Sequence, residues 1–201
     1  MPAETLYIID GYAAFFRCYH AIRTVMTSPV TREPTNMTFG FIGMLLKLLR
    51  AEGANIQTVG GKPTFLALAL DVGGDRGTFR SELYPLYKAN RDAPPEDLQQ
   101  QVERCLQVLT RIGVPVIGAP GFEADDVIAT LVERMGAEHP ELQVRLVSKD
   151  KDLKQLLSGD RVCMFDVHTD SPFTQATLEA VSYTHLRAHE TKANLVCRLL
   201  L

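Results

Sequence analysis

Short apolar segments that end in an acidic residue restrict the fold of this chain more than any other feature. Leu6–Asp10 has the sequence LYIID, and Thr64–Asp71 has the sequence TFLALALD. Three further segments with strand character lie at Val114–Gly118, Gln143–Ser148 and Arg161–Phe165. Continuous rather than alternating hydrophobicity is typical of parallel strands that are buried on both faces. The sequence therefore predicts a mainly parallel sheet.

Helical patterns separate these strands. Phe39, Ile42, Leu45, Leu46 and Leu49 recur at helical spacing after Thr35 or Asn36, either of which suits the N-cap position. Other helices are expected over Tyr12–Ile22, after Pro94-Pro95, over Phe122–Met135 and over Asp152–Leu157. Strands that alternate with helices predict an α/β fold with three layers, α/β/α, around the central sheet.

Seven carboxylates fall at strand ends or at a strand-to-helix junction. They are Asp10, Asp71, Glu123, Asp125, Asp126, Asp150 and Asp152. A parallel sheet brings the carboxyl ends of its strands to one edge, where so many like charges repel each other unless a cation lies among them. Oxygen ligands of this kind suit Mg²⁺ or Mn²⁺, and two such ions can activate water and stabilise the leaving oxygen in phosphoryl transfer. Taken singly, each acid could also be a turn former, a helix cap or a partner of the helix dipole.

Composition excludes several other classes of protein. The four cysteines, Cys18, Cys105, Cys163 and Cys197, show no paired spacing, which argues against a zinc site or a disulfide framework and favours the cytoplasm. The apolar runs are far shorter than the roughly 20 residues of a membrane span, and no secretory signal is visible. Gly60-Gly61-Lys62 continues into Pro63, so it is not a phosphate-binding loop.

Several longer motifs resemble those of one nuclease family. The stretches IIDGYAAFFRCYHA, REPTNMTFGF, ALDVGGDRGTFRSELYPLYKANR, GFEADDVIATL and VSKDKDLKQLL occur in unbroken order over about residues 5 to 180. They resemble the 5′-nuclease domain of bacterial DNA polymerase I, whose family includes the flap endonucleases and has a PIN-like core. The resemblance implies a structure-specific 5′-3′ exonuclease or flap endonuclease that hydrolyses DNA phosphodiesters with two Mg²⁺ ions, for which Mn²⁺ can substitute, during replication and repair.

The same resemblance implies a role for each acid. Asp10, Asp71, Glu123 and Asp125 would surround the first metal ion, with Asp126 beside them. Asp150 and Asp152 would contribute to the second ion.

The resemblance also implies which residues meet DNA. Residues 73–94 would form an arch over the site, where Arg80, Lys88 and Arg91 hold the scissile phosphate and Tyr87 stacks on a base. Arg17 and His20 fall where the family contacts DNA. For the three basic arch residues the alternative is a solvated helix face, and for Tyr87 it is core packing. For Arg17 and His20 the alternatives are a surface position or a core position with satisfied hydrogen bonds.

We expect two parts in the chain, a catalytic core over residues 1–180 and a tail over residues 181–201. The tail departs from the family: it contains no aspartate, and the helix-hairpin-helix-type clamp that would complete the second metal site is expected to be absent. Its last apolar residues keep a helical period, so a divergent final helix is the alternative to a non-native tail. The expected partner is branched or 5′-flap DNA, the expected state is a monomer, and polymerase domains would follow in the intact gene. A catalytically weak DNA-binding remnant and a PIN-type ribonuclease are the alternative functions.

The net charge of −3 does not contradict DNA binding. Without the seven clustered carboxylates the net charge would be +4. A basic surface around an acidic metal pocket gives such a total, because phosphate binding depends on the local charge.

Overall fold

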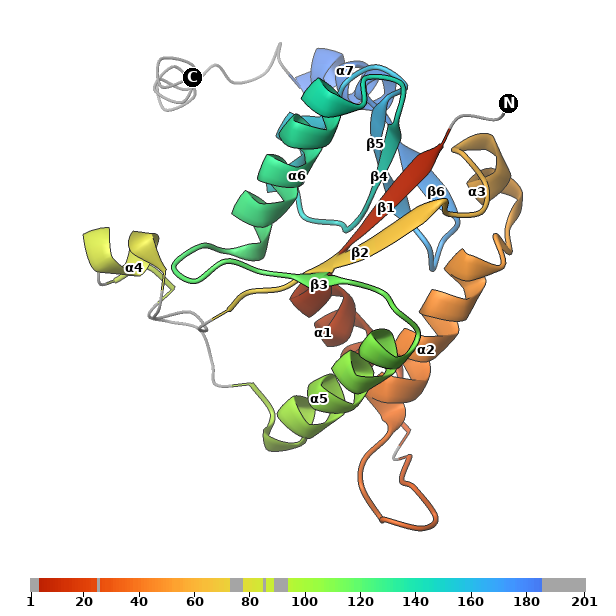
Figure 1. Ribbon diagram of the computed structural model, residues 1–201, viewed down its shortest axis with the longest axis vertical. Helices are drawn as coiled ribbons and strands as arrows, with labels where there is room; N and C mark the ends of the chain where they lie inside the picture. The colour runs from red at the N-terminus through yellow and green to blue at the C-terminus, as the bar shows by residue number, and fades with distance from the viewer. Residues whose placement is uncertain (1–3, 25, 73–77, 85, 89–93, 186–201) are drawn as a thin grey trace.

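Strand β1 (Thr5–Asp10) lies at the centre of a six-stranded sheet in the computed structural model of the protein (Figure 1). The structure describes residues 4–24, 26–72, 78–84, 86–88 and 94–185. The strand order is β3-β2-β1-β4-β5-β6, and all neighbours are parallel except β6, which pairs antiparallel with β5. The other strands are β2 (Phe65–Ala69), β3 (Val116–Ile117), β4 (Gln143–Val147), β5 (Val162–Asp166) and β6 (Ser171–Phe173). The predicted mainly parallel sheet is confirmed.

Helices cover both faces of this sheet (Figure 1). Tyr7 and Ile9 of β1 pack into a core cluster with α1, α2 and α5, whereas Leu6 and Ile8 pack into a second cluster with α6 and η1. This alternation along one strand confirms the three-layer α/β/α fold. The helices are α1 (Gly11–Ala21), α2 (Asn36–Leu49), α3 (Ala54–Thr58), α4 (Phe79–Leu83), α5 (Glu96–Arg111), α6 (Ala124–Glu138), the 3-10 helix η1 (Asp152–Leu156) and α7 (Gln175–His185).

The short elements differ most from the sequence-based expectation. The strand predicted at Val114–Gly118 forms only two ladder residues at the sheet edge, where a single neighbour supplies hydrogen bonds. Helices α3 and α4 have five residues each and β6 has three, which is too short for a periodic pattern to develop. Helix α7 extends to His185, beyond the boundary expected at residue 180. Among the described helices, none is both long and apolar enough to cross a membrane.

The register aligns the carboxyl ends of the central strands. Asp10 pairs with Ala69, Ile9 pairs with Val147, and Ala69 also pairs with Ile117. The residues that follow β1, β2 and β4 therefore leave the sheet at the same edge.

A buried glutamine fixes α2 against α5. Gln101 is only 1% exposed, and its Oε1 accepts hydrogen bonds from the backbone N–H groups of Met37 (2.9 Å) and Thr38 (3.2 Å). Its Nε2 donates to Asn36 Oδ1 and to Asp97 Oδ2. Thr35, expected as a possible cap, makes no side-chain capping bond. The N-terminus of α2 is thus capped by a residue of another helix, which the local sequence could not reveal.

We expect Gln101→Met to destabilise the fold by about 2 kcal/mol, because it preserves volume but removes the acceptor of a buried helix N–H group, that of Met37, and of a half-buried one, that of Thr38. The measurement is urea unfolding. Gln99→Met is the matched control: Gln99 is exposed on the same helix, and its side chain donates to Glu103 one turn further on. The control should stay within about 0.5 kcal/mol of the parent. Equal midpoints for both variants would contradict the capping role.

Candidate metal and nucleic-acid site

Asp10 lies at the junction of β1 and α1, with 6% of its surface exposed. Its Oδ1 accepts a long hydrogen bond from the backbone N–H of Ala13 (3.4 Å), so it also caps α1. Its Oδ2 accepts from the Ser148 hydroxyl (2.8 Å). A Cβ at the next residue, Gly11, would lie 2.6 Å from the carbonyl oxygen of Ala69. Glycine at this position therefore allows α1 to start directly against β2.

The N-terminus of α6 supplies the next acids. Glu123 is the N-cap residue of α6 and Asp126 is the third helical residue, and each side chain accepts from the backbone N–H of the other in a capping box. Asp125 lies between them in the first turn. Asp71, two residues past β2, accepts from the backbone N–H of Ala124, which ties the end of β2 to this helix. The local roles as caps are real, but they do not account for the crowding described below.

The segment after β4 supplies Asp150 and, as the first residue of η1, Asp152. The backbone N–H of Asp150 donates to Ser148 Oγ (3.0 Å), and the backbone N–H of Asp152 donates to Asp150 Oδ1 (2.9 Å). Ser148 therefore links Asp10 to this loop. The sequence interpretation missed Ser148, although a polar residue that closes an apolar strand just before two aspartates is the signal that would identify it.

These acids line one pocket of about 430 Å³. Six of the seven predicted carboxylates contribute to its wall, together with Tyr12, Phe16, Tyr87 and Lys88; the six are Asp10, Asp71, Glu123, Asp125, Asp150 and Asp152. Asp126 does not line the pocket. The expected convergence of the strand ends is thus what the structure shows for six of the acids.

Burial and mutual repulsion raise the pKa values of Asp125 and Asp10. The pKa of Asp125 is raised to about 7, first by burial and then by the charges of Asp10, Asp150, Asp71 and Glu123. Burial also raises the pKa of Asp10, to which the charges of Asp150 and Asp71 add. A pocket that holds back ionisation in this way has excess negative charge, which is the condition that favours a bound cation.

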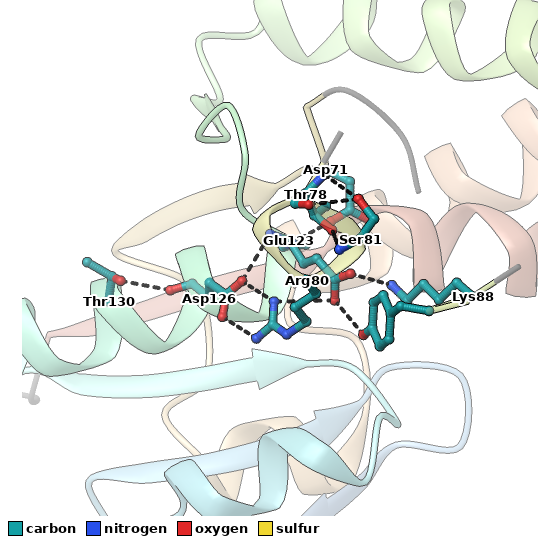
Figure 2. Close-up of polar contacts among 10 residues, drawn as sticks. Asp71, Thr78, Arg80, Ser81, Lys88, Glu123, Asp126 and Thr130 are labelled. Atoms are coloured by element: carbon teal, nitrogen blue, oxygen red, sulfur yellow. Dashed lines mark hydrogen bonds and ion pairs between the residues drawn. The ribbon is translucent and has the colours of Figure 1, made fainter. Parts of the chain in front are cut away.

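Two residues of the expected arch segment, Tyr87 and Lys88, contact Glu123 at the wall of the pocket. Figure 2 labels Lys88 beside Glu123. Lys88 Nζ lies 2.8 Å from Glu123 Oε1, and the Tyr87 hydroxyl donates to Glu123 Oε2 (3.2 Å). Lys88 also lies over the Tyr87 ring, 5.3 Å from its centroid. The predicted phosphate-binding lysine and the predicted stacking tyrosine thus lie together beside the acids.

Arg80 anchors α4 to α6 (Figure 2). Its two terminal nitrogens donate to the two carboxylate oxygens of Asp126, at 2.6 and 2.7 Å. The backbone N–H of Phe79 donates to the carbonyl of Gly121, and the Phe79 ring packs on Phe122. The hydrogen bonds from Arg80 lower the pKa of Asp126, so this acid is a charged partner of Arg80.

Protein donors occupy several of the acidic oxygens. In the described part of the chain, no group of three or more Asp, Glu, His or Cys side chains is arranged to hold a metal ion directly. Lys88 and Tyr87 hold Glu123, Ala124 holds Asp71, and Ser148 holds Asp10. A metal ion at these carboxylates would have to take the place of such donors.

The remaining candidates have different surroundings. Arg17 forms a bidentate ion pair with Asp166, 2.7 and 3.1 Å between the atoms, and lines a separate cavity. His20 is exposed, stacks on Phe16 and lies at another pocket, so it does not adjoin the acids. Arg91 lies outside the described residues, as does much of the segment 73–94.

One protein family and several curated relatives match the sequence of this chain. Residues 5–184 match the family described as "5'-3' exonuclease, N-terminal resolvase-like domain". DNA polymerase I of Mycobacterium bovis is 38% identical over 177 residues, which cover 88% of this chain and 18% of that protein. The 5'-3' exonuclease of Aquifex aeolicus is 34% identical over 172 residues, which cover 86% of this chain and 54% of that protein. The chain therefore spans less than a fifth of the polymerase and about half of the exonuclease.

Solved structures agree with these matches. The T5 D15 protein co-crystallised with metal ions superposes with a TM-score of 0.58 at 25% identity, covering 85% of this chain and 58% of that one. The resemblance seen in the sequence is confirmed.

Proposed function

Since the chain belongs to the 5′-3′ exonuclease N-terminal domain family, we propose that it is the metal-dependent nuclease core of a 5′-3′ exonuclease or flap endonuclease. The observation that carries this proposal is the pocket in which six carboxylates, from the ends of β1, β2 and β4 and from the N-terminus of α6, meet Lys88 and Tyr87. Acids alone would repel a phosphodiester. A phosphate can enter such a pocket only with cations between it and the acids, which a metal ion and Lys88 together provide.

The donor chemistry of the pocket fits Mg²⁺, with Mn²⁺ as a substitute. All the acids offer hard oxygen ligands, and the raised pKa of Asp125 marks charge that a divalent cation would neutralise. Asp10, Asp71, Glu123 and Asp125 would hold one ion, and Asp150 and Asp152 would hold part of a second. Asp126, outside the pocket and bonded to Arg80, would serve the first ion only through its neighbours. When bound, the ions supply an activated water and stabilise the leaving oxygen.

The protein's own groups have separate tasks in this proposal. Lys88 exchanges its contact with Glu123 for the scissile phosphate, and Tyr87 offers a ring for a base next to it. Arg80 keeps α4 attached to α6, which holds the chain leading to Lys88 near the pocket. Ser148 orients Asp10 through its hydroxyl group.

The experiment is cleavage of a labelled 5′-flap duplex, the matching plain duplex and a single-stranded RNA of the same sequence, with Mg²⁺, with Mn²⁺ and with EDTA. We expect products from the flap and none in EDTA, with Mn²⁺ more effective than Mg²⁺ because it binds oxygen and nitrogen sites more tightly. Cleavage of RNA in preference to branched DNA would favour a PIN-type ribonuclease. Binding without cleavage under all conditions would favour a DNA-binding remnant.

The proposal includes a monomer in the cytoplasm, attached to polymerase domains in the intact gene as in the DNA polymerase I relatives. Light scattering of the purified chain tests the oligomeric state.

A further inference from the structure

A second cavity of about 210 Å³ adjoins the acidic pocket. The two share Ala13 and Asp150 in their walls, so they are contiguous at this edge of the sheet. Arg17, Lys149 and Asp166 line the second cavity, and Asp166 ends β5 in the way that Asp10 ends β1. Asp166 thus continues the row of strand-end acids, but its surroundings are different.

Asp166 is surrounded by donors. Besides the bidentate pair with Arg17, its Oδ2 lies 2.6 Å from Lys149 Nζ and accepts from the Thr169 hydroxyl (2.6 Å), while the backbone N–H of His168 donates to Oδ1 (3.1 Å). Burial alone would raise its pKa, but the hydrogen bonds from Arg17, Lys149 and Thr169 outweigh this and hold the pKa well below the usual range. The group is a permanent anion that two cations share.

The exposures of the three side chains differ. The Asp166 side chain is 7% exposed, whereas Arg17 is 31% and Lys149 is 57% exposed. The carboxylate therefore lies behind the cations, which face solvent, and the three groups together carry a net charge of +1. A third cation, Lys47, donates to the carbonyl of Val167 (2.6 Å) on the same side.

Lys149 is adjacent to the acidic pocket, which explains why a separate anionic partner matters for it. Lys149 lies between Ser148, whose hydroxyl donates to Asp10, and Asp150, which lines both cavities. An unrestrained lysine or arginine beside several carboxylates would pair with them and compete with a metal ion. Asp166, which does not line the acidic pocket, gives both cations a different partner.

We propose that Asp166 is a positioning residue, which holds Arg17 and Lys149 as a paired clamp for a DNA backbone phosphate next to the one in the metal pocket. This inference rests on the proposed function, since it assumes that the substrate's backbone crosses the acidic pocket. The clamp would fix the register of the strand without reading its sequence.

The test distinguishes the positioning role of Asp166 from the effect of its charge, because the two predict opposite changes in DNA affinity for Asp166→Asn. This variant adds one positive charge, so charge alone would tighten DNA binding. Loss of positioning would instead weaken binding about five- to tenfold and reduce the slope of log K against log salt by about one. The measurement is anisotropy of a labelled 5′-flap duplex with the full chain in Ca²⁺, which takes hard oxygen ligands as Mg²⁺ does, and the DNA is recovered afterwards to check that it is intact.

Glu33→Gln is the matched control. Glu33 forms a 2.6 Å ion pair with Arg104 away from both cavities, and its neutralisation adds the same charge without touching the clamp. We expect unchanged or slightly tighter binding. In an Arg17→Met background, Asp166→Asn should change the affinity less than twofold, and Asp166→Glu should recover much of the parent affinity. Thermal melting of each variant separates these effects from unfolding.

Binding by Asp166→Asn that equals or exceeds that of the parent, with an unchanged salt slope, would overturn the inference. Binding without cleavage by the parent chain would overturn the proposed nuclease activity alone, since the clamp is judged by binding. A parent chain that fails to bind DNA at all would overturn both.

Discussion

Asp71→Asn is expected to reduce cleavage of a 5′-flap duplex at least about 100-fold while leaving the fold intact. The substitution removes a predicted metal ligand. A bound metal ion stabilises the charge of the transition state by several kcal/mol, and each loss of about 1.4 kcal/mol slows the reaction tenfold. The asparagine oxygen can still accept the hydrogen bond from Ala124, so the tie between β2 and α6 survives. Removing one of several crowded charges also relieves repulsion, so the melting temperature should be equal or higher.

The measurement is single-turnover cleavage with Mn²⁺ beside a thermal melt. Asp160→Asn is the charge-matched control, because Asp160 is exposed and precedes β5 at the opposite edge of the sheet. The control should cut at the parent rate. If Asp71→Asn lowers the melting temperature but the folded fraction cleaves at the parent rate, Asp71 is only a structural cap.

The stability of the metal-free protein is expected to fall as the pH rises from about 4 to about 7. The folded-state pKa of Asp125 is about 7, above the unfolded value of 3.8, so the folded state binds more protons in this window. The stabilisation is therefore complete below pH 4 and is lost as the pH rises through 7. After allowance for solvent screening at this half-buried group, the loss is on the order of 2 kcal/mol, or roughly 4 to 8 °C in melting temperature.

Divalent metal should reverse this trend. A metal ion binds the ionised carboxylates and displaces the proton, so the increase in melting temperature with Mn²⁺ or Mg²⁺ should itself grow between pH 5 and pH 8.

The control for the pH dependence is Asp125→Asn, which should reduce the slope, while the raised pKa of Asp10 contributes a slope of the same sign that remains. Burial lowers the pKa of His168, which acts in the opposite direction because a neutral buried histidine loses stability as the pH falls. The difference between the parent and Asp125→Asn isolates the carboxylate from this effect. Identical slopes in the two proteins would show that Asp125 does not carry the excess charge.

The sequence was sufficient to predict the strand ends and the acids that follow them. This success has a local cause. An apolar strand that ends in a carboxylate places that acid at its own carboxyl end, and parallel strands bring their carboxyl ends to the same edge of the sheet. By the same rule Asp166, directly after the predicted strand Arg161–Phe165, should have been included with the other acids. It was missed, and its role differs because its partners are cations.

The partners of charged side chains could not be predicted in this way. Asp166 and Arg17 are 149 residues apart in sequence, and Arg80 and Asp126 are 46 apart. Such pairs depend on how loops and helices meet once the sheet has formed, and one sequence holds no periodic signal for them. The same holds for Gln101, which caps α2 from another helix.

The segment between β2 and α5 is held to the core by contacts before and after its central part. Upstream, Thr78 and Phe79 bond to Gly121 and Arg80 bonds to Asp126; downstream, Asp97 accepts from the Tyr19 hydroxyl and Gln101 holds α2. The entropy of closing a loop rises by only about 0.6 kcal/mol for each doubling of its length. The length of the segment between these attachment points can therefore change by insertion or deletion at little cost to the stability of the core.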